Sequence, residues 1–169
     1  MWRYDGSNRP DFAETPKDNQ ESVWDYPRPP SIQWIDAEIK VVFEEKLLGK
    51  ANRAIRISET ASPPVFYMSF DDVNFTLLVK ATGSSFCEWK GIASYWKLSG
   101  EGEAPVAWSY ENPVPFYGDL KNCLAFYPGR VNCFLRGEKV LAQPGGFYGG
   151  WLTSHICGPV KGLPGTESW

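Results

Sequence analysis

The sequence of 169 residues contains one histidine, His155, and only four cysteines. Cys87, Cys123, Cys133 and Cys157 form no CxxC or CxxH pair. A structural zinc site generally needs at least one such closely spaced pair of ligands, so we expect no metal and no other cofactor. We expect reduced, mostly buried thiols, as is usual in a reducing compartment. A single histidine also excludes most mechanisms that depend on an imidazole.

An excess of positive charge and a long apolar run are also missing. Lys and Arg total 17 against 20 Asp and Glu, for a net charge of −3. Proteins that bind nucleic acids usually carry a basic excess that displaces phosphate counterions, so we expect no nucleic-acid partner. No segment approaches the roughly 18 apolar residues of a membrane-spanning helix, and the polar N-terminus has no signal-peptide apolar region. The sequence therefore predicts a cytoplasmic protein without a membrane partner.

Aromatic residues are abundant: 8 Trp, 8 Tyr and 10 Phe make up 15% of the chain. Each buried ring removes roughly 150–250 Å² from water, so these rings can build a thick core or the walls of a pocket. The 16 Gly and 14 Pro are spread along the chain and disfavour long helices.

Short apolar segments alternate with turn signals from Ile32 to about Leu141, a pattern typical of all-β proteins. It predicts a mostly β fold: one compact antiparallel domain, tent-like or barrel-like, with at most one or two short helices. The helix candidates are residues 31–36 and 116–122. The expected strands are residues 37–43, 47–51, 54–58, 65–68, 75–79, 85–89, 92–98, 106–110, 124–127, 131–135 and 139–142.

The composition divides the chain into three parts. Residues 1–22 are polar, with few apolar groups to offset the entropy of ordering, and are expected to form a mobile arm. Residues 23–142 form the β domain. Residues 143–169 hold seven Gly and three Pro, yet also four large rings that are costly to leave in water. We therefore expect this C-terminal tail to pack on the domain.

Several sequence blocks follow one another in a specific order. They are WDYPRPP at 24–30, RAIRISET at 53–60, PPVFY at 63–67, DDV at 71–73, CEWKGIASYW at 87–96 and AWSY at 107–110. In this order, over residues 24–136, they resemble the DUF427 family of small uncharacterised proteins. The resemblance implies a compact, mostly β fold of the tent-like kind. The tail with FYGGW at 147–151 resembles a cyanobacterial-type extension.

A nucleotidyl-transfer role has been attached to this family, and the sequence does not support it. Polymerase-β-like transferases need a Gly-Ser followed about ten residues later by two metal-binding carboxylates in D-x-D spacing. Gly83-Ser84 is followed by SYWK at 94–97. Asp71 and Asp72 precede it and are adjacent, so on a strand they would point to opposite faces.

The polar residues inside these blocks stand beside aromatic residues, which is the usual composition of a small-molecule pocket. The predicted ligand-binding residues are Arg56, Glu59, Tyr67, Lys90, Trp96, Trp108 and Tyr110. Simpler interpretations stay open: Arg56 and Glu59 can form an ion pair between strands, and Lys90 can be an exposed turn residue. Trp108 and Tyr110 share one strand face, which suits either core packing or ligand stacking.

Three functions follow from these residues. The first is a binding domain for a small molecule, held in an aromatic pocket by Arg, Glu and Lys anchors. The second is a small hydrolase, lyase or isomerase, whose proton-transfer candidates are Asp71, Lys90 and Glu59, with Cys87 as a candidate nucleophile. For Asp71 a turn cap, and for Cys87 a buried apolar role, are the simpler assignments. The third is an interaction module, such as a homodimer, that uses the proline segment or the tail.

Overall fold

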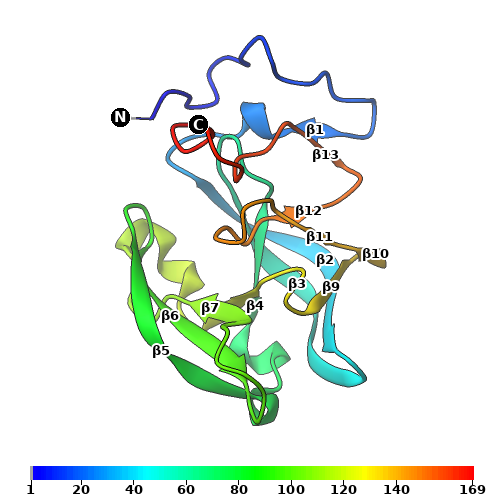
Figure 1. The fold of residues 1–169 in the computed structure, drawn as a ribbon, viewed down its shortest axis with the longest axis vertical. Coiled ribbons are helices and arrows are strands. Elements are labelled where there is room, and N and C mark those ends of the chain that lie inside the picture. Colours follow the sequence, from blue (N-terminus) through cyan, green and yellow to red (C-terminus); the bar gives the residue numbers. More distant parts are fainter. Residues whose placement is uncertain (1) are drawn as a thin grey trace.

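The computed structural model describes residues 2–169, and they form a mostly β fold. Nine antiparallel strands build one sheet in the order β10-β9-β2-β3-β4-β8-β7-β6-β5 (Figure 1). These strands are β2 (Ser31–Phe43), β3 (Lys46–Ser58), β4 (Val65–Ser69), β5 (Leu78–Cys87), β6 (Gly91–Leu98), β7 (Ala107–Ser109), β8 (Cys123–Phe126), β9 (Asn132–Leu135) and β10 (Glu138–Lys139). The mostly β prediction is confirmed. The sheet does not close into a barrel, since β10 and β5 remain its two edges.

The helical content is limited to four short 3-10 segments within residues 2–169. They are η1 (Val23–Asp25), η2 (Phe70–Asp72), η3 (Phe75–Leu77) and η4 (Pro115–Leu120). The helix expected at 116–122 corresponds to η4, whereas residues 31–36 are strand. There Ser31 pairs with Ser58 and Asp36 with Arg53, so pairing along β3 overrides any local helical preference.

Strands β2 and β3 are longer than the sequence indicates. The two segments expected at 47–51 and 54–58 form one continuous strand, β3, which pairs with β2 over almost its whole length. Within β2 the buried residues Ala37, Ile39 and Val41 alternate with exposed ones, as expected for a strand with one covered face.

Strand β5 also runs through a predicted turn. The turn expected at 82–84 is a bulge inside the strand: Lys80 pairs with Trp96, but the next pair is Ser84 with Ser94. Gly83 has a φ of 90°, which glycine adopts at little cost. After the bulge the β5–β6 hairpin continues to Cys87, and this extra length brings the end of the hairpin over one face of the sheet.

Alternation along the strands separates the aromatic residues of the nine-stranded sheet into two cores on opposite faces, and a third cluster around Trp24 lies beside the N-terminal arm and the tail. Phe66, Phe126 and Trp151 belong to the first core. Their chain neighbours Tyr67 and Tyr127 belong to the second. Successive side chains of a strand point to opposite faces, so each Phe-Tyr pair supplies one ring to each core. The first core is rich in aliphatic residues, whereas the second is dominated by Tyr and Trp.

The N-terminal arm and the tail meet at one end of the molecule (Figure 1). Strand β1 (Glu21–Ser22) pairs in parallel with β13 (Ile156–Cys157), and Phe12 stacks on Trp169 at a ring-centroid distance of 4.9 Å. Two further strands, β11 (Leu141–Ala142) and β12 (Trp151–Leu152), pair with each other. The mobility of residues 1–22 in solution stays a prediction.

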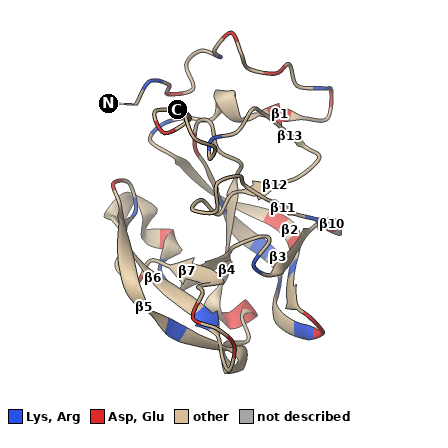
Figure 2. Cartoon of the chain, viewed as in Figure 1, with Lys and Arg blue, Asp and Glu red and all other residues tan. Residues whose placement is uncertain are grey.

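Charges are interspersed rather than separated by sign. Figure 2 shows Lys and Arg alternating with Asp and Glu over the strands and loops. Within residues 2–169 no helix is long and apolar enough to cross a membrane. No cluster of three or more His, Cys, Asp or Glu that could hold a metal ion occurs in this described part of the chain. All four cysteines are free.

Candidate functional site

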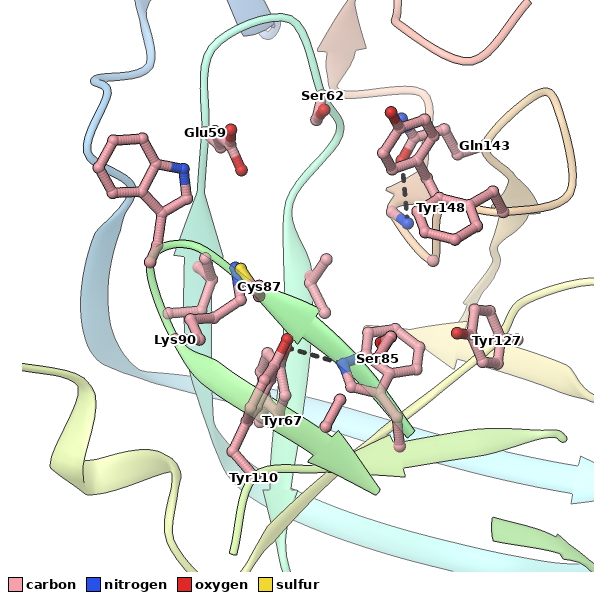
Figure 3. A pocket seen from close by; sticks show the side chains of 18 of the residues that line it. Glu59, Ser62, Tyr67, Ser85, Cys87, Lys90, Tyr110, Tyr127, Gln143 and Tyr148 are labelled. Atoms are coloured by element: carbon pink, nitrogen blue, oxygen red, sulfur yellow. Dashed lines mark hydrogen bonds between the residues drawn. The ribbon is translucent and has the colours of Figure 1, made fainter. Parts of the chain in front are cut away.

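A cavity of about 410 Å³ opens over the second, tyrosine-rich core. Strands β3, β4 and β7 form its floor, the β5–β6 hairpin forms one side, and tail residues 147–150 close another. In Figure 3, Glu59, Ser62, Gln143 and Tyr148 lie at one end of this space, and Tyr67, Tyr110, Ser85 and Tyr127 lie at the other. The cavity is therefore polar at one end and aromatic at the other.

The aromatic end is held rigid by contacts among its own rings. The indole Nε1 of Trp108 donates a hydrogen bond to the Tyr67 hydroxyl at 3.0 Å, and the two rings meet edge to face. Trp108 also packs on Tyr127, with ring centroids 4.4 Å apart. Ser85 and Tyr95 share a hydrogen bond of 2.6 Å. These contacts fix the walls in place without a ligand.

Burial keeps the phenols of this cavity protonated. Desolvation raises the pKa of Tyr67, of Tyr110 and of Tyr127 far above the ordinary tyrosine value. These side chains are therefore neutral hydroxyls over the physiological pH range. They supply hydrogen bonds but no negative charge to the cavity.

At the polar end, Glu59 and Gln143 already have partners. Glu59 Oε1 accepts a hydrogen bond from Arg28 Nε at 3.1 Å. Gln143 Oε1 accepts from the main-chain N–H of Gly150 at 3.0 Å, and its Nε2 donates to the Lys161 carbonyl at 2.8 Å. Gln143 thus attaches the tail loop to the segment that carries Lys161.

Two lysines also line the cavity. Lys90 lies in the turn between β5 and β6, where Gly91 adopts a φ of 104°, and the Lys90 carbonyl accepts a hydrogen bond from Val114 N–H at 3.0 Å. Only 9% of Lys90 is exposed. Lys161 is 3% exposed, and its Nζ lies 4.1 Å from the Trp2 ring centroid and 5.4 Å from that of Tyr148. Burial, and then the charge of Arg28, lower the pKa of Lys161.

The structure brings most of the predicted site residues together. Those that line this cavity are Glu59, Tyr67, Cys87, Lys90, Trp108 and Tyr110. Trp108 and Tyr110, two positions apart, face the same side as the sequence predicts. Arg56, Trp96 and Asp71 lie elsewhere.

Arg56 lies on the opposite face of β3 from its neighbour Ile57, which lines the cavity. Its guanidinium forms an ion pair with Glu21 and a hydrogen bond with the Tyr26 hydroxyl. The ion pair expected between Arg56 and Glu59 is therefore replaced by two separate pairs, Arg56 with Glu21 and Glu59 with Arg28. Arg56 instead lines a smaller hollow of about 330 Å³.

Trp96 and Asp71 are also separated from the cavity. Trp96 packs on Phe70 and Phe75 on the other face of the sheet, while its neighbour Tyr95 faces the cavity. Asp71 is exposed in η2, and its main-chain N–H donates to the Ser69 hydroxyl, which caps this short helix. Asp71 therefore occupies a capped turn.

Several cavity residues are absent from the set of site residues predicted from the sequence. Tyr95 and Tyr127 could have been found from strand alternation, since Tyr127 has the same parity as Ala125 of the second core. Gln143, Tyr148 and Lys161 come from the Gly- and Pro-rich tail, where no periodicity predicts which side chains turn inward. Their positions depend on how the tail docks.

Gly149 brings this tail loop into close contact with the cavity wall. A Cβ at this position would lie 2.2 Å from the Trp108 Cη2 atom. We expect Gly149→Ala to lower the free energy of unfolding by about 1–3 kcal/mol, because either the loop or the Trp108 ring must move. Urea denaturation measures this change. Gly102→Ala is the matched control, because its added Cβ meets nothing within 4 Å; equal effects of the two variants would contradict the close contact.

Comparison with known proteins identifies the family to which this chain belongs. A search of curated proteins finds no significant match to the chain. Residues 31–137, from the start of β2 to the turn before β10, match the family described as a domain of unknown function, DUF427. The match covers more than half of the chain and includes the floor and the β5–β6 side of the cavity, but not the tail residues. The protein therefore belongs to the DUF427 family.

Proposed function

We propose that the protein binds a small molecule in the aromatic cavity. The observation that carries this proposal is a preformed space of about 410 Å³ with Tyr and Trp walls and a few polar side chains at one end. Sites for metabolites and cofactors have this size and composition. The hydrogen bond and the ring contacts of Trp108 hold the cavity walls in place. Ligand binding therefore does not require these walls to become ordered.

Binding is better supported than catalysis. Of the proton-transfer candidates, Glu59 and Lys90 line the cavity but Asp71 does not. Glu59 is held by Arg28 in an ion pair with an N–O distance of 3.1 Å, which gives this carboxylate a structural role. The observed contacts therefore favour a ligand that is held rather than transformed.

The proposal also gives the tail a role. Residues Gln143, Tyr148 and Lys161 lie outside the matched family region and form part of the cavity wall. Under this proposal, the tail that resembles a cyanobacterial-type extension adjusts the pocket of a shared β domain to a particular ligand.

A fragment screen tests the proposal. Small flat aromatic compounds are expected to raise the melting temperature of the full chain, and hits are then measured by calorimetry. Tyr148→Ala, at a position 36% exposed, should leave the fold intact and weaken the hits about fivefold or more through lost ring contact. Trp108→Phe removes the Nε1 donor and replaces the two fused rings of the indole by one. This variant should also bind the hits more weakly.

Arg56→Ala and Trp34→Ala serve as controls outside the cavity. Both variants are expected to bind the hits with wild-type affinity. Hits that bind equally to all four variants would contradict the location of the site, and a complete absence of hits would contradict the proposed function.

A further inference from the structure

One cation of the cavity wall, Lys90, lacks a protein counterion within residues 2–169. Its side chain lines the cavity and is almost fully covered. Within this described part of the chain its Nζ also takes part in no hydrogen bond. The Nζ keeps contact with solvent, since Trp89 Nε1 is the one fully buried side-chain nitrogen or oxygen without a partner in residues 2–169. The Lys90 ammonium is therefore accessible to a ligand in the cavity.

The neighbouring residue Trp89 has a second unmatched donor. Across residues 2–169, the Trp89 indole Nε1 is the one buried side-chain nitrogen or oxygen without a hydrogen-bond partner. Trp89 lines the same cavity as Lys90. Buried polar atoms are almost always paired in folded proteins, so an unpaired donor on a residue of the cavity wall is a candidate partner for a bound acceptor.

Several polar groups of the cavity wall already have partners. Arg28 engages Glu59, Gly150 engages Gln143, and Trp2 Nε1 donates to Glu88 at 2.7 Å. Lys161 donates to the main-chain oxygen of Trp169 at 3.3 Å. Glu59 and Glu88 each use one carboxylate oxygen in these bonds. Among the residues described here, Lys90 is the cation of the wall that has no protein partner.

We propose that the ligand is a small anion, a carboxylate in its simplest form, whose charged group binds Lys90 and Trp89 while a flat apolar body lies against the tyrosine end of the cavity. This inference rests on the proposed function and specifies its ligand class. A carboxylate offers two acceptor oxygens, one for each unmatched donor. Its charge also supplies the counterion that Lys90 lacks.

The same groups disfavour a cationic ligand. Aromatic walls can bind ammonium groups through their ring faces. Here, however, Lys90 and Lys161 line the wall together with Glu59 and Glu88. Because Arg28 pairs with Glu59, positive groups outnumber negative ones in this set, and a cation is disfavoured. The two classes of ligand are thus separable by experiment.

Three indoles that differ only in their terminal group provide the test: indole-3-acetate, indole-3-acetamide and tryptamine. Their affinities for the full chain are measured by calorimetry. We expect the carboxylate to bind about tenfold more tightly than the amide, as a charge-assisted hydrogen bond predicts, and the amine to bind most weakly. An amide that binds as tightly as the carboxylate overturns the inference.

Substitutions at Lys90 test whether this residue causes the preference for the carboxylate over the amide. Lys90→Met keeps the length of the side chain and should remove the tenfold preference for the acid, while affinity for the amide changes by less than about twofold. Lys90→Arg should retain much of the preference. Lys50→Met, which removes an exposed lysine on β3, should match the wild type.

The outcomes separate the inference from the function on which it rests. A preference that survives Lys90→Met overturns the assignment to Lys90. Equal binding of all three indoles, weakened by Tyr148→Ala, overturns the anionic class and leaves the cavity as the site. Binding of none of the three overturns the inference, whereas the proposed function fails only if the fragment screen also gives no hits.

Discussion

Replacing Trp151 with alanine is expected to lower the free energy of unfolding by about 3–5 kcal/mol, the usual cost of removing a buried Trp side chain. Trp151 is 1% exposed, and its ring packs on Phe66 with centroids 5.3 Å apart. Its Nε1 donates to the Phe126 carbonyl at 3.1 Å. This residue lies in the tail but belongs to the first core, so the substitution leaves a large cavity and an unpaired carbonyl.

Two further variants separate these effects. Trp151→Phe keeps most of the apolar contact but removes the donor, and should cost less than the alanine variant. Trp34→Ala removes a Trp that is 38% exposed on β2 and should have a small effect, because much less apolar area leaves water. Equilibrium denaturation in urea measures all three. A loss below about 1 kcal/mol for Trp151→Ala would contradict the expectation that residues 143–169 pack on the domain.

Replacing Arg28 with methionine is expected to lower the free energy of unfolding by about 2–4 kcal/mol. The Arg28 side chain is 3% exposed. It donates to Glu59 Oε1 at 3.1 Å, to the Tyr4 carbonyl at 2.9 Å and to the Thr60 carbonyl at 2.9 Å. Its loss leaves the partly covered Glu59 carboxylate unpaired and removes the donors of two main-chain carbonyls.

Arg9 provides the matched control for this substitution. Arg9 pairs with Asp25, but the two side chains are 42% and 51% exposed. Exposed ion pairs contribute about 0–1 kcal/mol, so Arg9→Met should change stability little. Hydrogen exchange at residues 3–5 gives a second measurement, and we expect faster exchange in Arg28→Met because the contact with Tyr4 is lost. Equal stability losses for the two variants would show that the Arg28 contacts do not form in solution.

The presence of most strands follows from local sequence, so the prediction of a mostly β fold is confirmed. Alternation of apolar residues along segments such as 37–43 and 92–98 identifies β structure correctly, because a half-buried strand needs a period of two. The exact ends of the strands do not follow from local sequence. Residues 31–36 extend β2 because residues 53–58 of β3 pair with them, and Thr82 to Ser84 bulge rather than turn because β6 continues alongside.

The side of the sheet on which each residue lies is less certain from sequence. Arg56 and Trp96 belong to the correct strands, but each is one position away from a residue that faces the cavity, Ile57 and Tyr95. A shift of one residue moves a side chain to the opposite face. Alternation shows which residues share a face, but the face that carries the cavity is decided by where the β5–β6 hairpin and the tail lie.

Composition and alternation alone establish a mostly β chain with enough aromatic residues for a core and a pocket, and they select Trp108 and Tyr110 as neighbours on one face. Only the tertiary structure joins the tail residues Gln143 and Lys161 to that face and gives Glu59 its partner Arg28. The physical reason is that local preference acts over a few residues, whereas a cavity forms from segments that are distant in sequence and meet only through docking.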